Sequence, residues 1–301
     1  LYTGNGSANH AITLGGDTDM QPDLVWIKNR DAADSHCWFD AVRGATKVLH
    51  TDANSAEATD ADTLDSFATD GFQVDADVKV NTNTEKYVAF CWKESATAGF
   101  DIVSYTGTGS ATTFSHSLSA VPHLMIVKNR ETVEHWAVYH HKVSSDPETD
   151  FLKLNLTSAV GDDVNKWSDE APTSSVFTVG SSTYTNESTK DMIAYLFSEK
   201  QGFSKFGSYT GNGNADGAFV YTGFRPAFVM IKRTDGTNGW VMYDNKRQGY
   251  NANNDEIFAD VADAEVTTDD RFDILSNGFK CRSASADHNG SGATYIYAAF
   301  A

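Results

Sequence analysis

The chain has 301 residues, of which 40% are hydrophobic and 12% aromatic, and its formal net charge is −18. This composition supports packed cores in two or three domains and excludes global disorder. Every third of the chain is acidic, which argues against a nucleic-acid backbone or an anionic membrane as a partner. Three cysteines make no disulfide framework. No apolar stretch reaches the about 18 residues of a membrane-spanning helix, so we expect no membrane insertion.

The first repeated motif opens the chain. Tyr2-Thr3-Gly4-Asn5-Gly6 recurs, with small changes, at Tyr105 and at Tyr209. Glycine and asparagine at such spacing are typical of tight turns between strands. The chain enters this motif directly after Leu1 and without an initiator Met, from which we expect a processed chain or a segment of a longer polypeptide.

A second motif is a short apolar run that follows a proline and ends in basic residues. It occurs at Leu24–Arg30, Leu124–Arg130 and Phe228–Arg233. Proline suits the first residue of a strand, so each run is predicted to be a strand. We expect its basic residues to pair with acidic neighbours at the strand end. Binding of an acidic sugar is the alternative.

A tryptophan follows each of these runs, at Trp38, Trp136 and Trp240. Its repeated position among apolar neighbours predicts a buried ring. Helical periodicity is weak, and the candidate helical turns are residues 56–67 and 255–261. Each repeat closes with a strand that contains Phe and a terminal aromatic strand: Phe72–Val74 and Tyr87–Trp92, Val176–Val179 and Met192–Phe197, Phe279–Cys281 and Tyr295–Phe300.

Five motifs in one order, three times over, divide the chain into units 1–100, 101–206 and 207–301. A period of about 100 residues is too long for a solenoid coil and matches a whole small β-sandwich. We therefore predict an all-β protein of three tandem β-sandwich units. One larger β structure with pseudo-threefold symmetry is the alternative.

The sequence contains no P-loop, dinucleotide fingerprint, Cys-x-x-Cys or Gly-x-Ser-x-Gly motif. Carboxylates cluster at Asp60–Asp70 and Asp260–Asp270, with a thinner pair at Asp162 and Asp163. Solvated loop charges are the plain interpretation, calcium binding the second and a glycosidase pair the third. No acidic pair recurs at matching positions. We therefore predict that the protein is not an enzyme and has no cofactor, with calcium left open.

Ligand contacts are expected in loops, which differ among the units while the strands repeat. The most divergent polar loops are residues 146–150, 162–170 and 251–256. Trp167 stands in the second, outside the repeated pattern, and we expect an exposed ring there that can stack on a sugar. Tyr250 precedes the third. The predicted ligand-binding residues are therefore Trp167, Tyr250, Asp162 and Asp163.

Several stretches together resemble a β-rich repeat family found in virion and tail-fibre proteins of tailed, mainly marine, bacteriophages. They cover essentially the whole chain: Tyr2–Gly6, Pro22–Arg30, Asp40–Ala45, Ser66–Phe72, Tyr87–Lys93, Phe203–Gly213, Tyr221–Pro226 and Tyr295–Ala301. The second unit departs from the pattern, because it lacks the Asp-Gly or Asn-Gly turn before Phe177. The resemblance supplies no ligand and no catalytic residue.

The resemblance implies an extracellular protein of the virion surface that contacts other virion proteins and is often a homotrimer. We expect it to mediate host attachment, as a tail fibre or tail tip does, by weak multivalent binding of a surface glycan. The alternative is a purely structural virion module, such as a capsid decoration or spacer protein, without a ligand of its own.

Overall fold

The computed structural model describes residues 1–247, 251, 255–268 and 270–301. Its regular structure is almost entirely β, which confirms the predicted fold class. Within the described residues the helices are two single turns, α1 (Val78–Asn81) and α2 (Thr183–Asn186). Neither they nor any other described segment forms a helix long and apolar enough to cross a membrane.

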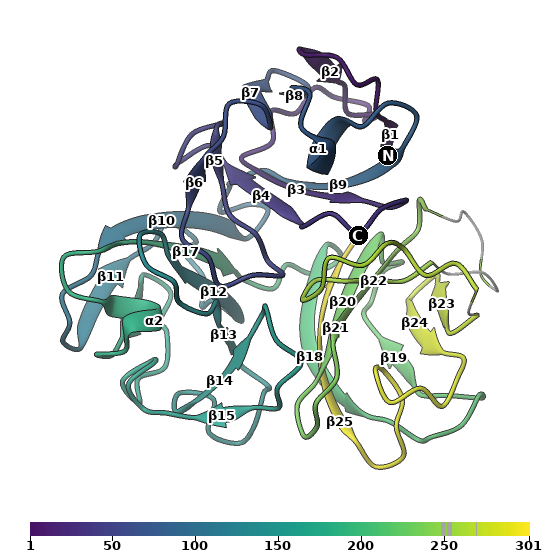
Figure 1. The fold of residues 1–301 in the computed structure, drawn as a ribbon. Helices are drawn as coiled ribbons and strands as arrows, with labels where there is room; N and C mark the ends of the chain where they lie inside the picture. Colours follow the sequence, from purple (N-terminus) through teal and green to yellow (C-terminus); the bar gives the residue numbers. More distant parts are fainter. Residues whose placement is uncertain (248–250, 252–254, 269) are drawn as a thin grey trace.

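Three larger sheets, called here the inner sheets, surround the centre of the molecule (Figure 1). The first has the order β1 (Tyr2–Thr3), β9 (Lys86–Trp92), β3 (Leu24–Asn29), β4 (Cys37–Asp40). The second has the order β10 (Phe100–Thr106), β17 (Asp191–Phe197), β12 (Leu124–Asn129), β13 (Ala137–His140), β14 (Asp150–Lys153), β15 (Gly161–Asp162). The third has the order β18 (Ser204–Thr210), β25 (Thr294–Phe300), β20 (Phe228–Arg233), β21 (Trp240–Asp244), β22 (Ile257–Phe258).

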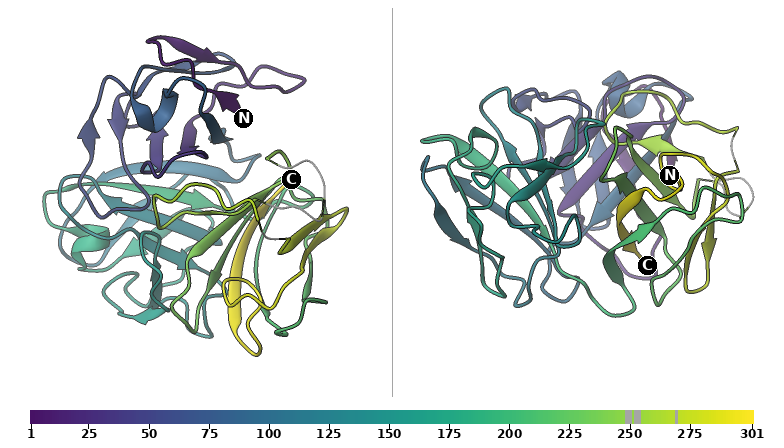
Figure 2. Two further views of the ribbon diagram at one scale, coloured as in Figure 1. Left: turned by 45° about the vertical axis from the view of Figure 1, so that its right-hand side comes forward. Right: turned by 90° about the horizontal axis from the view of Figure 1, so that it is seen from below.

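Three smaller sheets, called the outer sheets, lie at the periphery (Figures 1 and 2). The first joins β2 (His10–Ile12), β8 (Gly71–Val74) and β7 (Leu64–Ala68). The second joins β11 (Thr112–Ser115) and β16 (Val176–Val179), and the third joins β19 (Phe219–Tyr221), β24 (Gly278–Cys281) and β23 (Phe272–Leu275). A further ladder pairs β5 (Lys47–Val48) with β6 (Ala58–Thr59).

The two predicted helical turns are wrong. Residues 56–67 contain β6 and the start of β7, and residues 255–261 contain β22. In β7 the register shifts between Leu64 and Ser66, as at a β-bulge. The shift allows Leu64 and Phe67, three residues apart, to pack against the same core. This spacing imitates one helical turn in the sequence.

The strands β3, β12 and β20 of the inner sheets carry apolar side chains on both faces because each face meets a different core. In β3, Leu24 and Trp26 enter a central core, whereas Val25 and Ile27 enter the core beneath the first outer sheet. Alternation of side chains along a strand produces this division. The strands β12 and β20 divide their side chains in the same way.

The central core is shared by all three inner sheets. Trp38, Trp136 and Trp240 meet there with exposed fractions of 1%, 0% and 2%, which confirms the predicted burial. The ring centroids of Trp38 and Trp136 are 5.6 Å apart. Each inner sheet thus packs on its own outer sheet and on its two fellow inner sheets. The predicted unit boundaries fall close to the first residues of β10 and β18.

Candidate functional site

The repeated Tyr-Thr-Gly motif forms a turn against a buried asparagine. The Asn5 N–H donates to Asn81 Oδ1 at 2.9 Å, and Asn81 Nδ2 donates to the Ser7 carbonyl at 2.8 Å. A Cβ added at Gly4 would lie 2.1 Å from the Thr82 carbonyl oxygen, so only glycine fits. Asn186 and Asn289 hold the turns of the other two units in the same way. The motif is therefore architectural.

The arginines of the strand-end clusters pair with carboxylates, as predicted. Arg130 donates from Nε and Nη2 to the two oxygens of Glu57 at 2.9 and 3.0 Å, and Arg43 donates to the same carboxylate at 3.1 Å. Partial burial of Glu57 favours its neutral form, but the two guanidinium groups lower its pKa. Arg30 pairs with Glu265 at 2.7 Å. The Arg130–Glu57 pair joins the second third of the chain to the first, and the Arg30–Glu265 pair joins the first third to the last.

The lysines of the same clusters are buried instead of paired with acids. Lys128 Nζ donates to the Asn129 carbonyl at 2.8 Å, and Lys232 Nζ donates to the carbonyls of Arg233 and Thr157. Burial lowers the pKa of Lys128 and of Lys232 to about 8, and that of Lys28 likewise. A sugar carboxylate in solution has no access to these ammonium groups.

The predicted ligand-binding residues do not converge on a site. The expected exposure of Trp167 is wrong, because its ring is fully buried in the core of the second unit and Nε1 donates to the Asp150 carbonyl at 2.9 Å. Asp163 accepts a hydrogen bond from Lys166 Nζ at 2.6 Å, and Asp162 is exposed in β15. Tyr250 lies outside the described residues.

Members of both larger acidic clusters accept hydrogen bonds from main-chain N–H groups. Asp60 accepts from the Asp62 N–H, and Asp260 accepts from the Trp240 N–H at 2.7 Å. Asp269 lies outside the described residues. Across the part of the chain that the structure describes, no group of three or more His, Cys, Asp or Glu side chains is placed to hold a metal ion.

The strand β19 presents two exposed aromatic rings that the sequence analysis did not single out. Phe219 is 48% exposed and Tyr221 is 62% exposed, whereas Val220 between them is 7% exposed and faces the third core. Because side chains alternate along a strand, the two rings lie on one face of the outer sheet. We call this surface, Phe219 with Tyr221, the aromatic face.

The cross-strand partners of the two rings are a lysine for Phe219 and a glycine for Tyr221. Phe219 lies opposite Lys280, which forms an ion pair with Asp216, and hydrogen bonding to Lys280 lowers the pKa of the Asp216 carboxyl. Tyr221 lies opposite Gly278. A Cβ at Gly278 would approach the Val220 carbonyl oxygen to 2.0 Å, so glycine is required there and the position opposite Tyr221 carries no side chain.

The other two outer sheets carry small side chains at the equivalent places. The register pairs Val220 with Phe279 in the third outer sheet, Ile12 with Phe72 in the first and Phe114 with Phe177 in the second. The two positions that flank the residue opposite this phenylalanine are therefore equivalent in the three outer sheets. They are Phe219 and Tyr221 in the third, Ala11 and Thr13 in the first, and Thr113 and Ser115 in the second. A comparison of the flanking residues across the repeats is the signal that could have found this face.

The whole chain, residues 1–301, matches the sequence model of the family described as Domain of unknown function (DUF7483), and the chain therefore belongs to that family. Neither the search of curated proteins nor the search of solved structures found a match.

Proposed function

We propose that this member of the DUF7483 family is a non-catalytic module of a virion appendage that attaches to a glycan on the host surface. The aromatic face would make the contact. The observation that carries the proposal is the pair of adjacent exposed rings, Phe219 and Tyr221, on one face of β19. Its place in the virion rests on the resemblance of the repeated motifs to phage tail-fibre proteins.

The chemistry of the aromatic face suits a sugar. A pyranose ring has an apolar face of C–H groups, which can pack on an aromatic ring, and a rim of hydroxyls. The ion pair of Lys280 with Asp216 and that of Arg282 with Asp273, at 3.4 Å, place donors and acceptors beside the rings. A flat surface buries little of a ligand, so each contact is weak. Several copies of the chain on one virion would supply avidity on a repetitive envelope.

The absence of a catalytic role is part of the same proposal. Three buried carboxylates among the described residues are engaged in structural contacts: Asp40 pairs with Arg43, Asp244 pairs with Arg247, and Glu256 accepts a hydrogen bond from Tyr243. Depolymerisation of a host polysaccharide by the purified chain would contradict this part of the proposal.

A purely structural role is the second candidate, and the shared central core favours it. Three inner sheets that pack on one core make a rigid body. Such a body suits a spacer or decoration protein as well as a receptor-binding tip.

Titration of host envelope polysaccharide against the chain separates the two candidates. We expect saturable weak binding that Tyr221→Ala and Phe219→Ala each reduce at least tenfold. Val133→Ala is the control, because Val133 is exposed and apolar but lies in the second unit. Equal loss in the control would point to non-specific adhesion. No binding to any envelope fraction would favour the structural candidate.

A further inference from the structure

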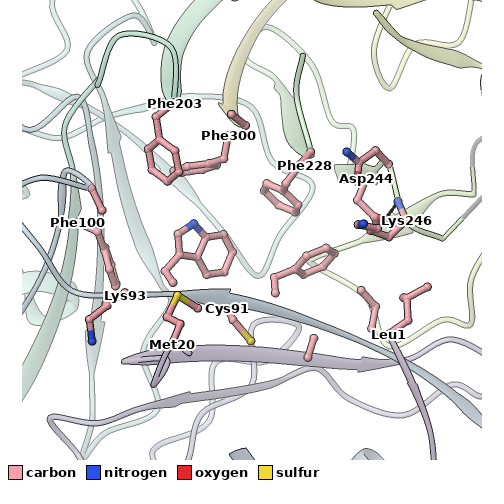
Figure 3. Close-up of a pocket in the computed structure, with 18 residues that line it drawn as sticks. Leu1, Met20, Cys91, Lys93, Phe100, Phe203, Phe228, Asp244, Lys246 and Phe300 are labelled. Atoms are coloured by element: carbon pink, nitrogen blue, oxygen red, sulfur yellow. Dashed lines mark hydrogen bonds between the residues drawn. The ribbon is translucent and has the colours of Figure 1, made fainter. Parts of the chain in front are cut away.

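Aromatic rings also gather in a pocket of about 390 Å³ between the first and third inner sheets (Figure 3). Figure 3 shows Phe203, Phe228 and Phe300 around it, and the described residues that line it are mostly apolar. The hydroxyls of a sugar would lose their water there and would find few polar side chains in return. The aromatic face of β19, in contrast, lies beside charged side chains, which makes it the better surface for a ligand rich in hydroxyls.

Two rows of cross-strand partners face outward on the third outer sheet, and each row takes one residue from each of its strands. The first row consists of Tyr221, Gly278 and Leu275, and the second of Phe219, Lys280 and Asp273. The row between them is buried in the third core. Because side chains alternate along each strand, both flanking rows lie on the outer face.

The first row has a gap at Gly278, where the sheet carries no side chain. The space above this glycine is bounded by Tyr221 on one neighbouring strand and by the half-buried Leu275 on the other. Adjacent strands lie about 4.8 Å apart, so the two bounding strands are about 10 Å apart. Lys280 follows Gly278 by two residues on the same strand and on the same face. A ring packed on Tyr221 therefore has a cation beside it.

Lys280 occupies a place that is neutral in the other two outer sheets. Its equivalents lie opposite Ala11 in the first sheet and opposite Thr113 in the second, and they are Gln73 and Thr178. A cation and a pair of exposed aromatic rings thus coincide in the third unit.

The carboxylate that pairs with Lys280 is exchangeable. It belongs to Asp216, whose side chain is 83% exposed on the loop before β19. An exposed ion pair contributes little to stability because water and salt screen it, so another carboxylate can take the place of Asp216. The second cation of this face, Arg282, pairs with Asp273, which is better buried at 14% exposure. The pair with Asp216 also shows which chemical group the Lys280 ammonium accepts.

Long-range electrostatics alone would repel an acidic ligand, since the net charge of the chain is −18. Salt screens this repulsion beyond about 8 Å at physiological ionic strength. Binding of an acidic ligand is therefore decided by cations at contact distance, where a hydrogen bond between charged groups is about twice as strong as one between neutral groups. Lys280 is such a cation.

We propose that the aromatic face selects a sugar that carries a carboxylate, such as a uronic acid, and that Lys280 determines this specificity. The apolar face of the sugar ring packs on Tyr221 and extends over Gly278 toward Leu275. The sugar carboxylate accepts a hydrogen bond from Lys280 Nζ and displaces Asp216 from it. This selectivity rests on the proposed attachment to a host glycan, to which it adds the chemical class of the sugar.

The test titrates host envelope polysaccharide against the complete chain by calorimetry. The polysaccharide is used in two forms, native and with its carboxyl groups chemically reduced to primary alcohols. The reduction removes the negative charge and keeps the sugar rings and their linkages. We expect the native form to bind about tenfold more tightly, because the reduced form has lost a charge-assisted hydrogen bond.

Two substitutions beside the rings assign this preference to Lys280. Lys280→Gln, which introduces the residue type of the equivalent Gln73, should bind both forms with the affinity of the reduced form. Asp216→Asn removes the competing carboxylate and should tighten binding of the native form alone by about threefold. Lys190→Gln is the control, because it removes a cation from an exposed ion pair of the second unit, and it should keep the full preference.

Each alternative outcome contradicts a different statement. Equal binding of the two forms would overturn the selectivity and leave the proposed attachment to a glycan standing. A preference for the native form that Lys280→Gln retains would overturn the role of Lys280. The absence of binding of either form would overturn the attachment itself, and the selectivity with it. Thermal melting of Lys280→Gln and Asp216→Asn establishes that the variants are folded, and the comparison of the two forms on the unaltered chain depends on neither.

Discussion

The contact between the first and second inner sheets and the contact between the second and third are built on the same frame. At the first contact, the Glu57 N–H donates to the Arg130 carbonyl at 2.7 Å and Trp136 Nε1 donates to the His50 carbonyl at 3.0 Å. At the second, the Val160 N–H donates to Thr234 at 2.9 Å and Trp240 Nε1 to Lys153 at 2.9 Å. Main-chain groups and tryptophans set the geometry of both.

The side chains that surround these hydrogen bonds differ between the two contacts. At the first contact, Arg43 is buried in an ion pair with Asp40, and Tyr195 of the second sheet donates to Asp40 at 2.6 Å. At the second contact, His140 occupies the position equivalent to Asp40, because it lies opposite Leu124 as Asp40 lies opposite Leu24. Val143, three residues later, is then equivalent to Arg43. His140 Nε2 donates to the Tyr297 carbonyl of the third sheet at 3.2 Å.

A second histidine joins the same contact. His141 Nε2 donates to the Phe206 carbonyl at 3.0 Å, and its ring centroid lies 5.3 Å from that of His140. The two rings lie close together because β13 ends at His140 and the alternation of side chains along a strand does not extend to His141. The main-chain and tryptophan hydrogen bonds are thus common to both contacts. The side chains around them differ, because an ion pair at the first contact is replaced by neutral groups at the second.

Substitutions of the tryptophans that both contacts share should cause the largest losses in the free energy of unfolding. Trp136→Ala and Trp240→Ala each remove a fully buried indole and its hydrogen bond to the neighbouring sheet, and each should lower the free energy of unfolding by about 3–5 kcal/mol. Chemical denaturation measures this loss. Similar losses at the two positions would support the comparison, and wild-type stability of either variant would break it.

The ionic groups of the first contact should have the next largest effect. Glu57→Gln removes the carboxylate shared by Arg43 and Arg130 and leaves buried positive charge, so the free energy of unfolding should fall by about 3 kcal/mol. Val160→Ala is the matched variant, because Val160 holds the place of Glu57 at the second contact and carries no charge. An equal or larger loss in Val160→Ala would show that the ion pairs contribute nothing beyond packing.

The imidazoles of the second contact predict a pH dependence. Burial, and then the neighbouring His141, lowers the pKa of His140 to about 3 from its ordinary value of 6.5. Between about pH 3 and 6.5, the unfolded chain therefore binds a proton at His140 that the folded chain does not bind. This contribution to stability is complete above pH 6.5 and is lost as the pH falls toward 3.

His140→Gln should reduce the slope of stability against pH by about 1.4 kcal/mol per pH unit between pH 6 and 4. Denaturation midpoints across this range measure it. Charged groups that act on the neighbouring imidazoles of His141 and His123 are Lys142, Lys205 and Glu199, and the last two pair with each other at 3.1 Å. Glu57→Gln is the control, since the lowered pKa of this carboxyl affects stability around and below its ordinary value of 4.5 and leaves the slope near pH 6 unchanged. An unchanged slope in His140→Gln would contradict the account.

The sequence predicts burial correctly at positions that repeat among the three units and fails at a position that does not repeat. The burial of Trp38 and Trp240 was predictable because each repeats among apolar neighbours. Trp167 was not, because Asn165, Lys166 and Ser168 around it are polar and only the folded loop brings its ring into the second core.

Two further features could not be predicted from the sequence: hydrogen-bond partners that are far apart in the chain, and which face of a strand is buried. Asn81 acts on residues more than seventy positions away, which local patterns do not show. Its fixed spacing ahead of Tyr87, repeated for Asn186 and Asn289, was the available signal. In Phe219–Tyr221 all three residues are apolar, so periodicity cannot separate the buried face from the exposed one.

The smallest effect on stability is expected at the aromatic face. Tyr221 is exposed and has no side chain opposite it, so Tyr221→Ala should change the free energy of unfolding by less than about 0.5 kcal/mol. Thermal melting measures this against Trp240→Ala. A loss of 2 kcal/mol or more, a threshold about fourfold above surface substitutions, would assign the ring a structural role.

Hydrogen exchange with and without host envelope polysaccharide tests the central claim most directly, because it locates a ligand without any substitution. The account predicts slower exchange in Phe219–Tyr221 and Gly278–Cys281 and unchanged exchange in the loop of residues 162–170. Slower exchange confined to that loop, or no change anywhere in the chain at saturating polysaccharide, would contradict it.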